Sequence, residues 1–294
     1  MANDTPRLYL VDGSSYIFRA FFALPPLTNS AGLSTNAIYG FTNMMLKFLK
    51  QHQPQYLAIA LDAGRETFRN EIFADYKANR PEAPAELIPQ FPYIRKVLDA
   101  LNVPVLELQG YEADDIIATI CKMLSGKDCE LIVVSSDKDL MQLVTNGIKL
   151  LDSAKDRWIG AQEVKAKFGV EPQRIVDVMG LMGDPVDNIP GVKGIGEKTA
   201  IALMQQFHSL EHLFEHLDDL EKTQLRGIAR IRKALEEGKH AAFLSRDLAT
   251  VKIDVPIQVD MDRLRLCNPD RDKLRALFEE LNFNNLLKLL DHIL

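Results

Sequence analysis

The sequence is poor in several features that would each indicate a particular class of protein. It has three cysteines, Cys121, Cys129 and Cys267, with no C-x-x-C pair, so neither a disulfide framework nor a cysteine zinc site is expected. No apolar run approaches the ~20 residues that cross a bilayer. The N-terminus lacks the basic start and apolar core of a signal peptide. These absences predict a soluble protein of a reducing cytosol, with no membrane partner.

Positive charge is also scarce, because 35 Lys and Arg stand against 41 Asp and Glu, for a formal net charge of −6. This balance argues against a simple cationic coat for nucleic acid. It does not exclude a nucleic-acid enzyme whose carboxylates collect metal ions. Hydrophobic residues at 47% and charged residues at 26% are ordinary globular proportions, which excludes a disordered or fibrous chain.

The first half of the chain repeats short apolar, β-rich runs, each followed by acidic residues and a helical stretch. The expected strands are 7–11, 56–61, 103–108, 130–135 and 148–151. Strands that alternate with helices predict a parallel α/β sheet. In such sheets the functional site lies outside the carboxyl ends of the strands, where this sequence places one carboxylate after another.

The composition changes twice along the chain. The segment 64–90 is polar, rich in aromatic and basic residues, and closes with three prolines, which predicts a partly helical excursion over the mouth of the sheet. Beyond about residue 163 helices dominate. They are expected over 161–168, 175–182, 198–206, 210–217, 222–237 and 240–248. We therefore predict an α/β core over 1–168, which includes the excursion, and a helical domain over 169–294.

Carboxylates from five separate segments define the first candidate site. They are Asp12, Asp62, Glu112, Asp114, Asp115, Asp137, Asp139, Asp184 and Asp187. Collecting so many like charges at strand ends costs free energy unless hard cations neutralise them. Oxygen-only ligands indicate Mg²⁺ or Mn²⁺ rather than zinc, and two such ions perform phosphoryl chemistry. The alternative, an acid that is merely a loop residue or helix cap, is equally good for any one of them but not for the set.

The second candidate site is the glycine-rich loop 189–200. It resembles a Walker A loop, but Glu197 stands where that motif needs lysine and no strand leads into it, so we exclude a nucleotide-binding P-loop. Three glycines in six residues, followed by a helix N-terminus with Lys198, predict backbone amides that hold a phosphate without reading a base. A plain helix–turn–helix connection, the alternative, needs only one glycine.

Three further clusters carry weaker signals. Cations and rings interleave along 65–80, as on surfaces that bind single strands or strand ends, although an ordinary amphipathic helix looks similar. A basic stretch over 222–233 indicates either a duplex-backbone contact or a solvated face. His208, His212 and His216 fall four apart on a predicted helix, but no obvious partner completes a zinc site, so we expect a solvated face.

Five motifs follow one another along almost the whole chain. They are VDGSSYIFRAFFALPPL from Val11, LDAGRETFRNEIFADYKANRP from Leu61, GYEADD from Gly110, SSDKDL from Ser135 and GLMGDPVDNIPGVKGIGEKTA from Gly180. In this order they resemble the 5′-nuclease domain of bacterial DNA polymerase I, within the flap endonuclease/5′→3′ exonuclease family. The resemblance implies a parallel-sheet α/β nuclease core of the PIN/flap-endonuclease type, a helical arch over 64–90, and a helical domain with a helix–hairpin–helix-like DNA clamp.

The resemblance also implies roles for individual residues. Asp12, Asp62, Glu112 and Asp114 would belong to a first metal site, and Asp137, Asp139, Asp184 and Asp187 to a second, with Asp115 nearby. Lys77 and Arg80 would contact the scissile phosphate, Tyr76 would stack on a base, and Arg19 would help to hold the 5′ end. The duplex phosphates, with a K⁺ ion as in relatives, would be gripped by Gly191, Val192, Gly194, Gly196, Lys198 and Thr199.

One position departs from the family pattern. The family usually carries two serines between Asp184 and Asp187, and this chain has Pro185 and Val186. Because the carboxylates themselves are kept, we expect activity to survive with altered loop rigidity and hydrogen bonding.

We therefore predict a structure-selective, Mg²⁺-dependent 5′-nuclease that hydrolyses DNA at 5′ flaps, nicks and 5′ ends in replication and repair. A two-metal mechanism would leave a 5′-phosphate and a 3′-hydroxyl, and a polymerase domain is expected in the same or a separate chain. The nearest alternative is a compact ribonuclease with a similar acidic core, which would need no duplex clamp. The intact acids disfavour a non-catalytic junction-binding scaffold. A HAD-type phosphatase would need an acid where Ser14 stands.

Overall fold

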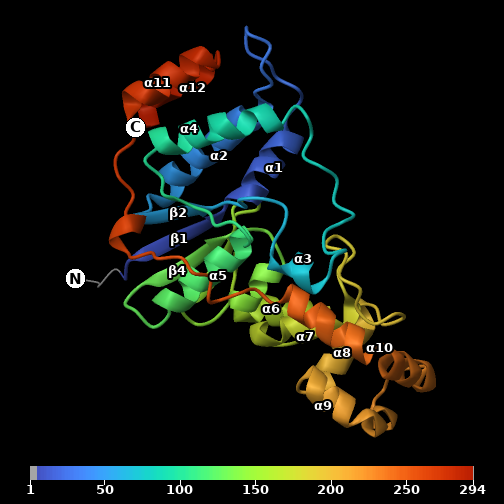
Figure 1. Ribbon diagram of the computed structural model, residues 1–294. Coiled ribbons are helices and arrows are strands. Elements are labelled where there is room, and N and C mark those ends of the chain that lie inside the picture. Colours follow the sequence, from blue (N-terminus) through green and yellow to red (C-terminus); the bar gives the residue numbers. More distant parts are fainter. Residues whose placement is uncertain (1–4, 294) are drawn as a thin grey trace.

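A mostly parallel β-sheet lies at the centre of the computed structural model, which describes residues 5–293 (Figure 1). Its described strands are β1 (Arg7–Asp12), β2 (Tyr56–Ala60), β3 (Val105–Leu106), β4 (Glu130–Val134), β5 (Ile148–Asp152) and β6 (Arg157–Ile159), in the spatial order β3-β2-β1-β4-β5-β6. All neighbours pair in parallel except β6, which is antiparallel to β5. The structure confirms the five predicted strands and adds β6, whose three residues are too few to show a period.

Helices cover both faces of the sheet, which explains why its strands are nearly continuous apolar runs (Figure 1). Because side chains alternate along a strand, Leu8 and Leu10 face one core while Tyr9 and Val11 face the other. The Tyr9 side is covered by α1 (Gly13–Ala23), α2 (Asn36–His52) and α4 (Phe91–Ala100). The Leu8 side is covered by α5 (Ala113–Leu124), α6 (Ala161–Phe168) and α7 (Ile175–Met182).

The helical domain shares one continuous hydrophobic core with the Leu8 side of the sheet. Its further helices are α8 (Glu197–Gln206), α9 (Leu210–Glu215) and α10 (Ile228–Ala249), which bury Leu203, Leu213 and Leu235 in that same core. The helices predicted over 161–168 and 175–182 are confirmed. The prediction of two helices over 222–237 and 240–248 is wrong, because Gly238 does not interrupt α10. Gly238 lies against Val192, whose Cγ1 would be 2.7 Å from an added Cβ.

The last two helices return to the first domain. Helix α11 (Arg271–Glu280) packs on α4, and α12 (Asn284–Ile293) packs on α2. Figure 1 shows them at the opposite end of the molecule from α9. The predicted helical domain over 169–294 therefore needs correction at its C-terminal end, because Leu274, Phe278 and Leu286 complete the Tyr9-side core.

The segment 64–90 is partly helical, as its composition predicts, and the helical arch implied by the resemblance is limited to two short helices. It contains α3 (Phe68–Ile72) and the 3₁₀ helix η1 (Ile88–Gln90), joined by a chain of turns. Prolines at 81 and 84 oppose helix formation there. The far end is anchored by Gln90, whose Oε1 accepts the amides of Ala37 and Ile38 at the start of α2, at 2.8 and 3.1 Å. We call this segment the arch.

Four more 3₁₀ helices connect the described elements. They are η2 (Asp139–Leu143), η3 (Pro172–Arg174), η4 (Leu217–Lys222) and η5 (Asp262–Leu264). None of the helices in the described part of the chain combines the length and apolar character needed to span a membrane.

Candidate active site

A cavity of about 240 Å³ opens at the carboxyl ends of β1, β2 and β4. Its lining residues are Asp12, Ser14, Ser15, Phe18, Asp62, Lys77, Arg80, Glu112, Ala113, Asp114, Asp137 and Asp187. Six predicted carboxylates are therefore brought to one cavity by β1, β2, β4, α5 and the loop after α7. Two more, Asp139 and Asp184, lie outside this lining, and Asp139 is close enough to Asp137, Asp184 and Asp187 for their charges to interact.

Asp12 ends β1 and caps α1, so one residue serves both the sheet and the cavity. Its Oδ1 accepts the amide of Ser15 at 3.0 Å, and its Oδ2 accepts the hydroxyl of Ser135 at 2.9 Å. Burial raises the pKa of Asp12, and the charge of Asp62 adds to this, while the serine hydrogen bonds oppose it. The carboxylate is thus held in place by hydrogen bonds but is poorly solvated.

The start of α5 brings a second group of acids to the cavity. Asp62, just after β2, accepts the amide of Ala113 at 2.8 Å, which fixes the helix N-terminus against the end of the strand. The pKa of Asp114 is raised well above its usual range, first by burial and then by the charges of Asp12 and Asp137. These carboxylates repel one another, which is the condition under which a hard cation binds well.

The acids after β4 and after α7 form the other side of the site. Ser135 accepts the amide of Asp137 at 3.0 Å, so one serine connects Asp12 with the segment that follows β4. Asp139 has a buried Oδ1 with no hydrogen-bond partner among the described residues. Burial, followed by the charge of Asp137, raises the pKa of Asp139 well above its usual range. An orphaned, buried carboxylate oxygen is what a missing cation would explain.

The loop that carries Pro185 and Val186, where the sequence departs from the family pattern, is ordered by hydrogen bonds within the loop. Asp184 and Ile189 exchange backbone hydrogen bonds of 2.9 and 2.8 Å, and Asp184 Oδ1 accepts the amide of Val186 at 2.8 Å. Val186 points outward, with 65% of it exposed. Pro185 and Val186 therefore leave Asp184 and Asp187 buried on either side of an ordered turn.

Four cationic side chains face these acids. Lys77 Nζ lies 2.6 Å from Glu112 Oε1 and 3.7 Å from Asp187 Oδ2, and Arg80 is paired with Asp187. Arg69 Nη1 lies 3.5 Å from Glu112 Oε2, and Lys138 Nζ lies 2.9 Å from Asp184 Oδ2. Burial alone would lower the pKa of Lys77, but the attraction of Glu112 and Asp187 outweighs it and raises the pKa. The arch thus supplies three of the four cations.

Among the described residues, no three His, Cys, Asp or Glu side chains stand close enough together to hold a metal ion as they are placed. The carboxylates surround the cavity and are bridged by cations instead. The donor set nonetheless suits hard divalent cations, because it is all oxygen, it is partly buried, and Asp139 retains a free buried oxygen. Metal binding would require these carboxylates to close in as the lysines leave.

Two of the predicted site residues, Asp115 and Tyr76, have structural contacts that differ from their predicted roles. Asp115 is fully buried, pairs with Arg69 through both oxygens at 2.8 Å, and also accepts the amides of Glu112 and Lys252, so its assignment as a metal ligand is wrong. Tyr76 is 5% exposed, and its hydroxyl donates to Glu112 Oε2 at 3.2 Å. The expectation that its ring stacks on a base is wrong in this structure, since the ring is buried.

Ser15, Ser135 and Lys138 contact the site carboxylates but were not predicted from the sequence. Ser15 and Ser135 position Asp12, and the only signal for them is their spacing beside Asp12 and Asp137 in the motifs. Lys138 carries no signal, because a lysine between two acids looks like any solvated charge. Arg19 does not line the cavity; its guanidinium lies 4.4 Å from the Tyr16 ring centroid, and Nη2 is 3.4 Å from Ser153 Oγ.

In the glycine-rich loop, the first glycine serves packing. Gly191 has φ +61°, and an added Cβ would lie 2.4 Å from the backbone nitrogen of Gly183. Its amide donates to Ser245 Oγ at 2.8 Å, and the amide of Val192 donates to Leu181 at 2.8 Å. The expected phosphate contacts from the Gly191 and Val192 amides are therefore wrong, because both donors are already used.

The second part of the loop remains open to a ligand. Gly194 has φ +91°, and Gly196 caps α8 with an extended backbone. The amides of Gly194, Gly196 and Lys198 have no acceptor among the described residues, and the Lys198 side chain is exposed. The amide of Thr199 is used by Gly196, which leaves its hydroxyl. This end of the loop can bind an anion.

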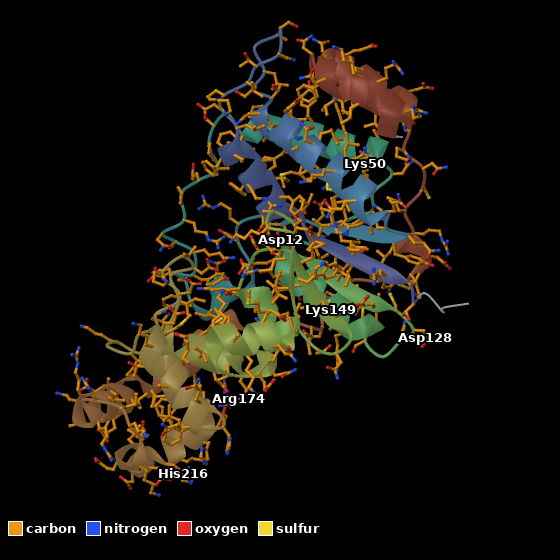
Figure 2. All side chains as sticks on the ribbon, turned by 180° about the vertical axis from the view of Figure 1, so that it is seen from behind. Asp12, Lys50, Asp128, Lys149, Arg174 and His216 are labelled. Atoms are coloured by element: carbon orange, nitrogen blue, oxygen red, sulfur yellow. The ribbon has the colours of Figure 1, made fainter. Side chains whose placement is uncertain are left out.

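The three histidines lie far from the cavity. Their rings follow one another beside α9, with centroids 5.3 Å apart for His208 and His212 and 4.4 Å apart for His212 and His216, and with the ring planes tilted by 36° and 34°. Figure 2 shows His216 near the tip of the helical domain, well away from Asp12.

Comparisons with known proteins agree with this architecture. The family model described as "5'-3' exonuclease, N-terminal resolvase-like domain" matches residues 7–169, and "5'-3' exonuclease, C-terminal SAM fold" matches residues 170–272. The chain is 43% identical to DNA polymerase I of Bacillus subtilis, over 98% of this chain and 32% of that protein. It is 42% identical to the 5'-3' exonuclease of Aquifex aeolicus, over 97% of this chain and 96% of the relative. The chain thus spans about a third of the polymerase relative.

Solved structures share the fold at lower identity. The T5 5'-exonuclease with bound zinc has a TM-score of 0.66 and 21% identity, covering 98% of this chain and 99% of that one. A T5 D15 flap endonuclease complex with DNA and metal ions has a TM-score of 0.67 and 21% identity, covering 98% of both chains. The catalytic core of Rad2 with DNA substrate has a TM-score of 0.65 and 16% identity, covering 97% of this chain and 92% of that one.

Proposed function

Because this chain belongs to the 5′-3′ exonuclease family, we propose that it is a metal-dependent 5′-nuclease that hydrolyses DNA phosphodiesters at 5′ flaps, nicks and free 5′ ends. One observation carries the proposal: six carboxylates from five segments line a single cavity and face Lys77 and Arg80 of the arch. A cavity lined by both acids and cations matches the needs of a phosphodiester, a water and hard cations together.

The carboxylates would hold the metal ions. Asp12, Asp62, Glu112 and Asp114 would hold a first Mg²⁺ or Mn²⁺ ion, and Asp137, Asp139, Asp184 and Asp187 would hold a second. Such ions would supply a hydroxide near neutral pH and would take up charge on the leaving oxygen. The chain's own part is to orient these acids, through Ser15 and Ser135 on Asp12 and through Tyr76 on Glu112.

The arch cations would bind the scissile phosphate. Lys77 and Arg80 are now paired with Glu112 and Asp187. With those carboxylates committed to metal ions, both side chains would need another anionic partner, and a phosphate oxygen would supply it. Arg19, which lies against Tyr16 and Ser153 outside the cavity lining, would help to hold the 5′ end.

The hairpin would hold the duplex. The free amides of Gly194, Gly196 and Lys198 and the hydroxyl of Thr199 can donate to phosphate oxygens, and oxygen atoms of the same loop would hold a K⁺ ion. Because these groups would contact only DNA phosphates, binding of the duplex would not depend on the DNA sequence.

The relatives include both a polymerase I and a 5'-3' exonuclease matched over nearly its whole length. We propose that this protein acts in bacterial DNA replication and repair, in the cytosol, beside a polymerase domain in the same or a separate chain.

End-labelled flap DNA tests the proposal. Wild type should cleave it in Mg²⁺ and not in EDTA, while Asp12→Ala and Asp137→Ala should abolish cleavage and retain binding in Ca²⁺. Asp128→Ala is the matched control, because Asp128 is exposed at the opposite end of the sheet from Asp12 (Figure 2). Full-rate cleavage by either active-site variant, or by wild type in EDTA, would refute the metal-dependent nuclease.

A further inference from the structure

We propose that Lys138 is the resident counter-cation of the second half of the carboxylate site and that it must leave Asp184 before a divalent ion binds there. The inference rests on the proposed function, because it concerns the same acids. It adds a role for a residue that neither lines the cavity nor belongs to the arch.

The contact is well defined. Lys138 precedes η2 and sits between Asp137 and Asp139 in the chain, yet its Nζ reaches Asp184 Oδ2 at 2.9 Å, from a segment 46 positions away. The side chain of Asp184 is 5% exposed, so its charge is almost unsolvated, whereas that of Lys138 is 32% exposed. Within residues 5–293, Lys138 is the cationic side chain that forms an ion pair with Asp184. The other carboxylate oxygen of Asp184 accepts a hydrogen bond from the Val186 amide.

The neighbours explain why a cation is needed. Asp137, Asp184 and Asp187 all act on Asp139, whose buried Oδ1 has no hydrogen-bond partner among the described residues. Lys77 and Arg80 pair with Glu112 and Asp187, and both belong to the arch. Lys138 instead comes from the core beside β4, so a movement of the arch does not remove it.

Competition with a metal ion follows from the geometry. Asp184 Oδ2 cannot keep an ammonium at 2.9 Å and also ligate a divalent ion, because the two cations would repel each other at contact distance. Lys138 therefore stabilises the metal-free protein and weakens metal affinity. Its partial exposure lets it swing into solvent when an ion arrives.

The experiment measures metal binding and metal-free stability without DNA. Mn²⁺ titration of the full chain, followed by electron paramagnetic resonance, should show Lys138→Met binding on the order of 10-fold more tightly than wild type, as expected for removal of one adjacent charge. Thermal unfolding in EDTA should show a Tm lower by about 2–4 °C or more. Lys138→Arg, which keeps the charge, should stay near wild type in both measurements.

Lys167→Met is the matched control. Lys167 is exposed and lies close enough to Lys138 and Asp137 for the charges to interact, but no described carboxylate forms an ion pair with it. An equal gain in affinity for Lys167→Met would show a general charge effect and overturn the proposal. Unchanged or weaker Mn²⁺ binding by Lys138→Met would also overturn the role proposed for Lys138. The proposed metal-dependent function would still stand in that case, provided that the wild-type protein binds Mn²⁺. If wild type binds no Mn²⁺, both fail.

Discussion

Arg69 and Asp115 form a buried bidentate ion pair, with both nitrogen–oxygen distances at 2.8 Å and side chains that are 2% and 0% exposed. Arg69 also donates to the carbonyls of Leu248 and Thr250 at 2.9 and 3.0 Å. One guanidinium thus joins α3 at the base of the arch, the start of α5, and the C-terminal end of α10. Because α5 begins beside Glu112, this pair fixes an active-site carboxylate relative to the helical domain.

Arg69→Met should therefore destabilise the protein by about 3–5 kcal/mol, because it leaves the carboxylate of Asp115 buried and unpaired. Urea unfolding followed by circular dichroism measures this. Arg7→Met is the control, since Arg7 also pairs with an acid at 2.8 Å, Glu130, but its side chain is 56% exposed. That surface pair should contribute about 0–1 kcal/mol. Equal losses for the two variants would contradict the role given to Arg69.

The same pair shows where sequence reasoning stops. The strands and Asp12 could be located because an apolar run that ends in a carboxylate is a local pattern, and helices 161–168 and 175–182 have local boundaries. Asp115 lies three residues after Glu112, which fits a shared ligand face as well as an ion pair. The partner that decides, Arg69, is 46 positions away and becomes visible only in the fold.

Other errors have the same origin. Gly238 looks like a helix break, but it is needed for the close approach of Val192 within a continuous α10. The interleaved rings and cations of the arch suggest a DNA surface, yet Tyr76 turns inward to Glu112. In each case a long-range contact overrides a local preference.

Asp114→Asn should stabilise the metal-free protein at neutral pH. The pKa of Asp114 is raised by burial and then by Asp12 and Asp137. Such a group stabilises the fold fully below its unfolded pKa, about 3.9, and this contribution is lost as pH rises through the higher folded-state pKa. In EDTA the variant should therefore be more stable than wild type at pH 7–8, by on the order of 1–3 kcal/mol, and equal to it near pH 4.

Urea unfolding across this pH range checks the result, with exposed Asp128→Asn as a neutral control. Saturating Ca²⁺ should reverse the order at pH 7–8, because wild type then gains a ligand that the variant has lost. A variant less stable than wild type in EDTA at pH 8 would show that the ionised carboxylate of Asp114 does not destabilise the metal-free fold.

Lys77→Ala should slow single-turnover cleavage far more than it weakens flap binding. A cation beside the scissile phosphate matters most as charge builds in the transition state, and losing one such group costs on the order of 10²-fold or more. Quenched-flow cleavage of end-labelled flap DNA gives the rate. Lys50→Ala, an exposed lysine near the end of α2 (Figure 2), should cleave at the wild-type rate. A Lys77→Ala rate within a few-fold of wild type would remove Lys77 from the reacting phosphate.

Gly196→Val should weaken binding to flap substrates with a long duplex arm while leaving the fold intact. The backbone of Gly196 has φ −92°, and an added Cβ meets no atom within 4 Å, so the protein itself accommodates valine. A phosphate held by the amides at the start of α8 would not, because the branched side chain stands where the strand must approach. The expected loss therefore comes from the DNA contact alone.

Fluorescence anisotropy in Ca²⁺ separates the two substrates, since a single-stranded 5′ end never reaches the hairpin and should bind Gly196→Val as it binds wild type. Gly191→Ala is the contrasting variant, because its Cβ would lie 2.4 Å from the Gly183 nitrogen at φ +61° and should lower Tm instead. The loss for Gly196→Val should be similar for any duplex sequence, because phosphates carry no base information. Equal weakening on duplex and single-stranded substrates, with an unchanged circular dichroism spectrum, would refute the hairpin as the duplex clamp.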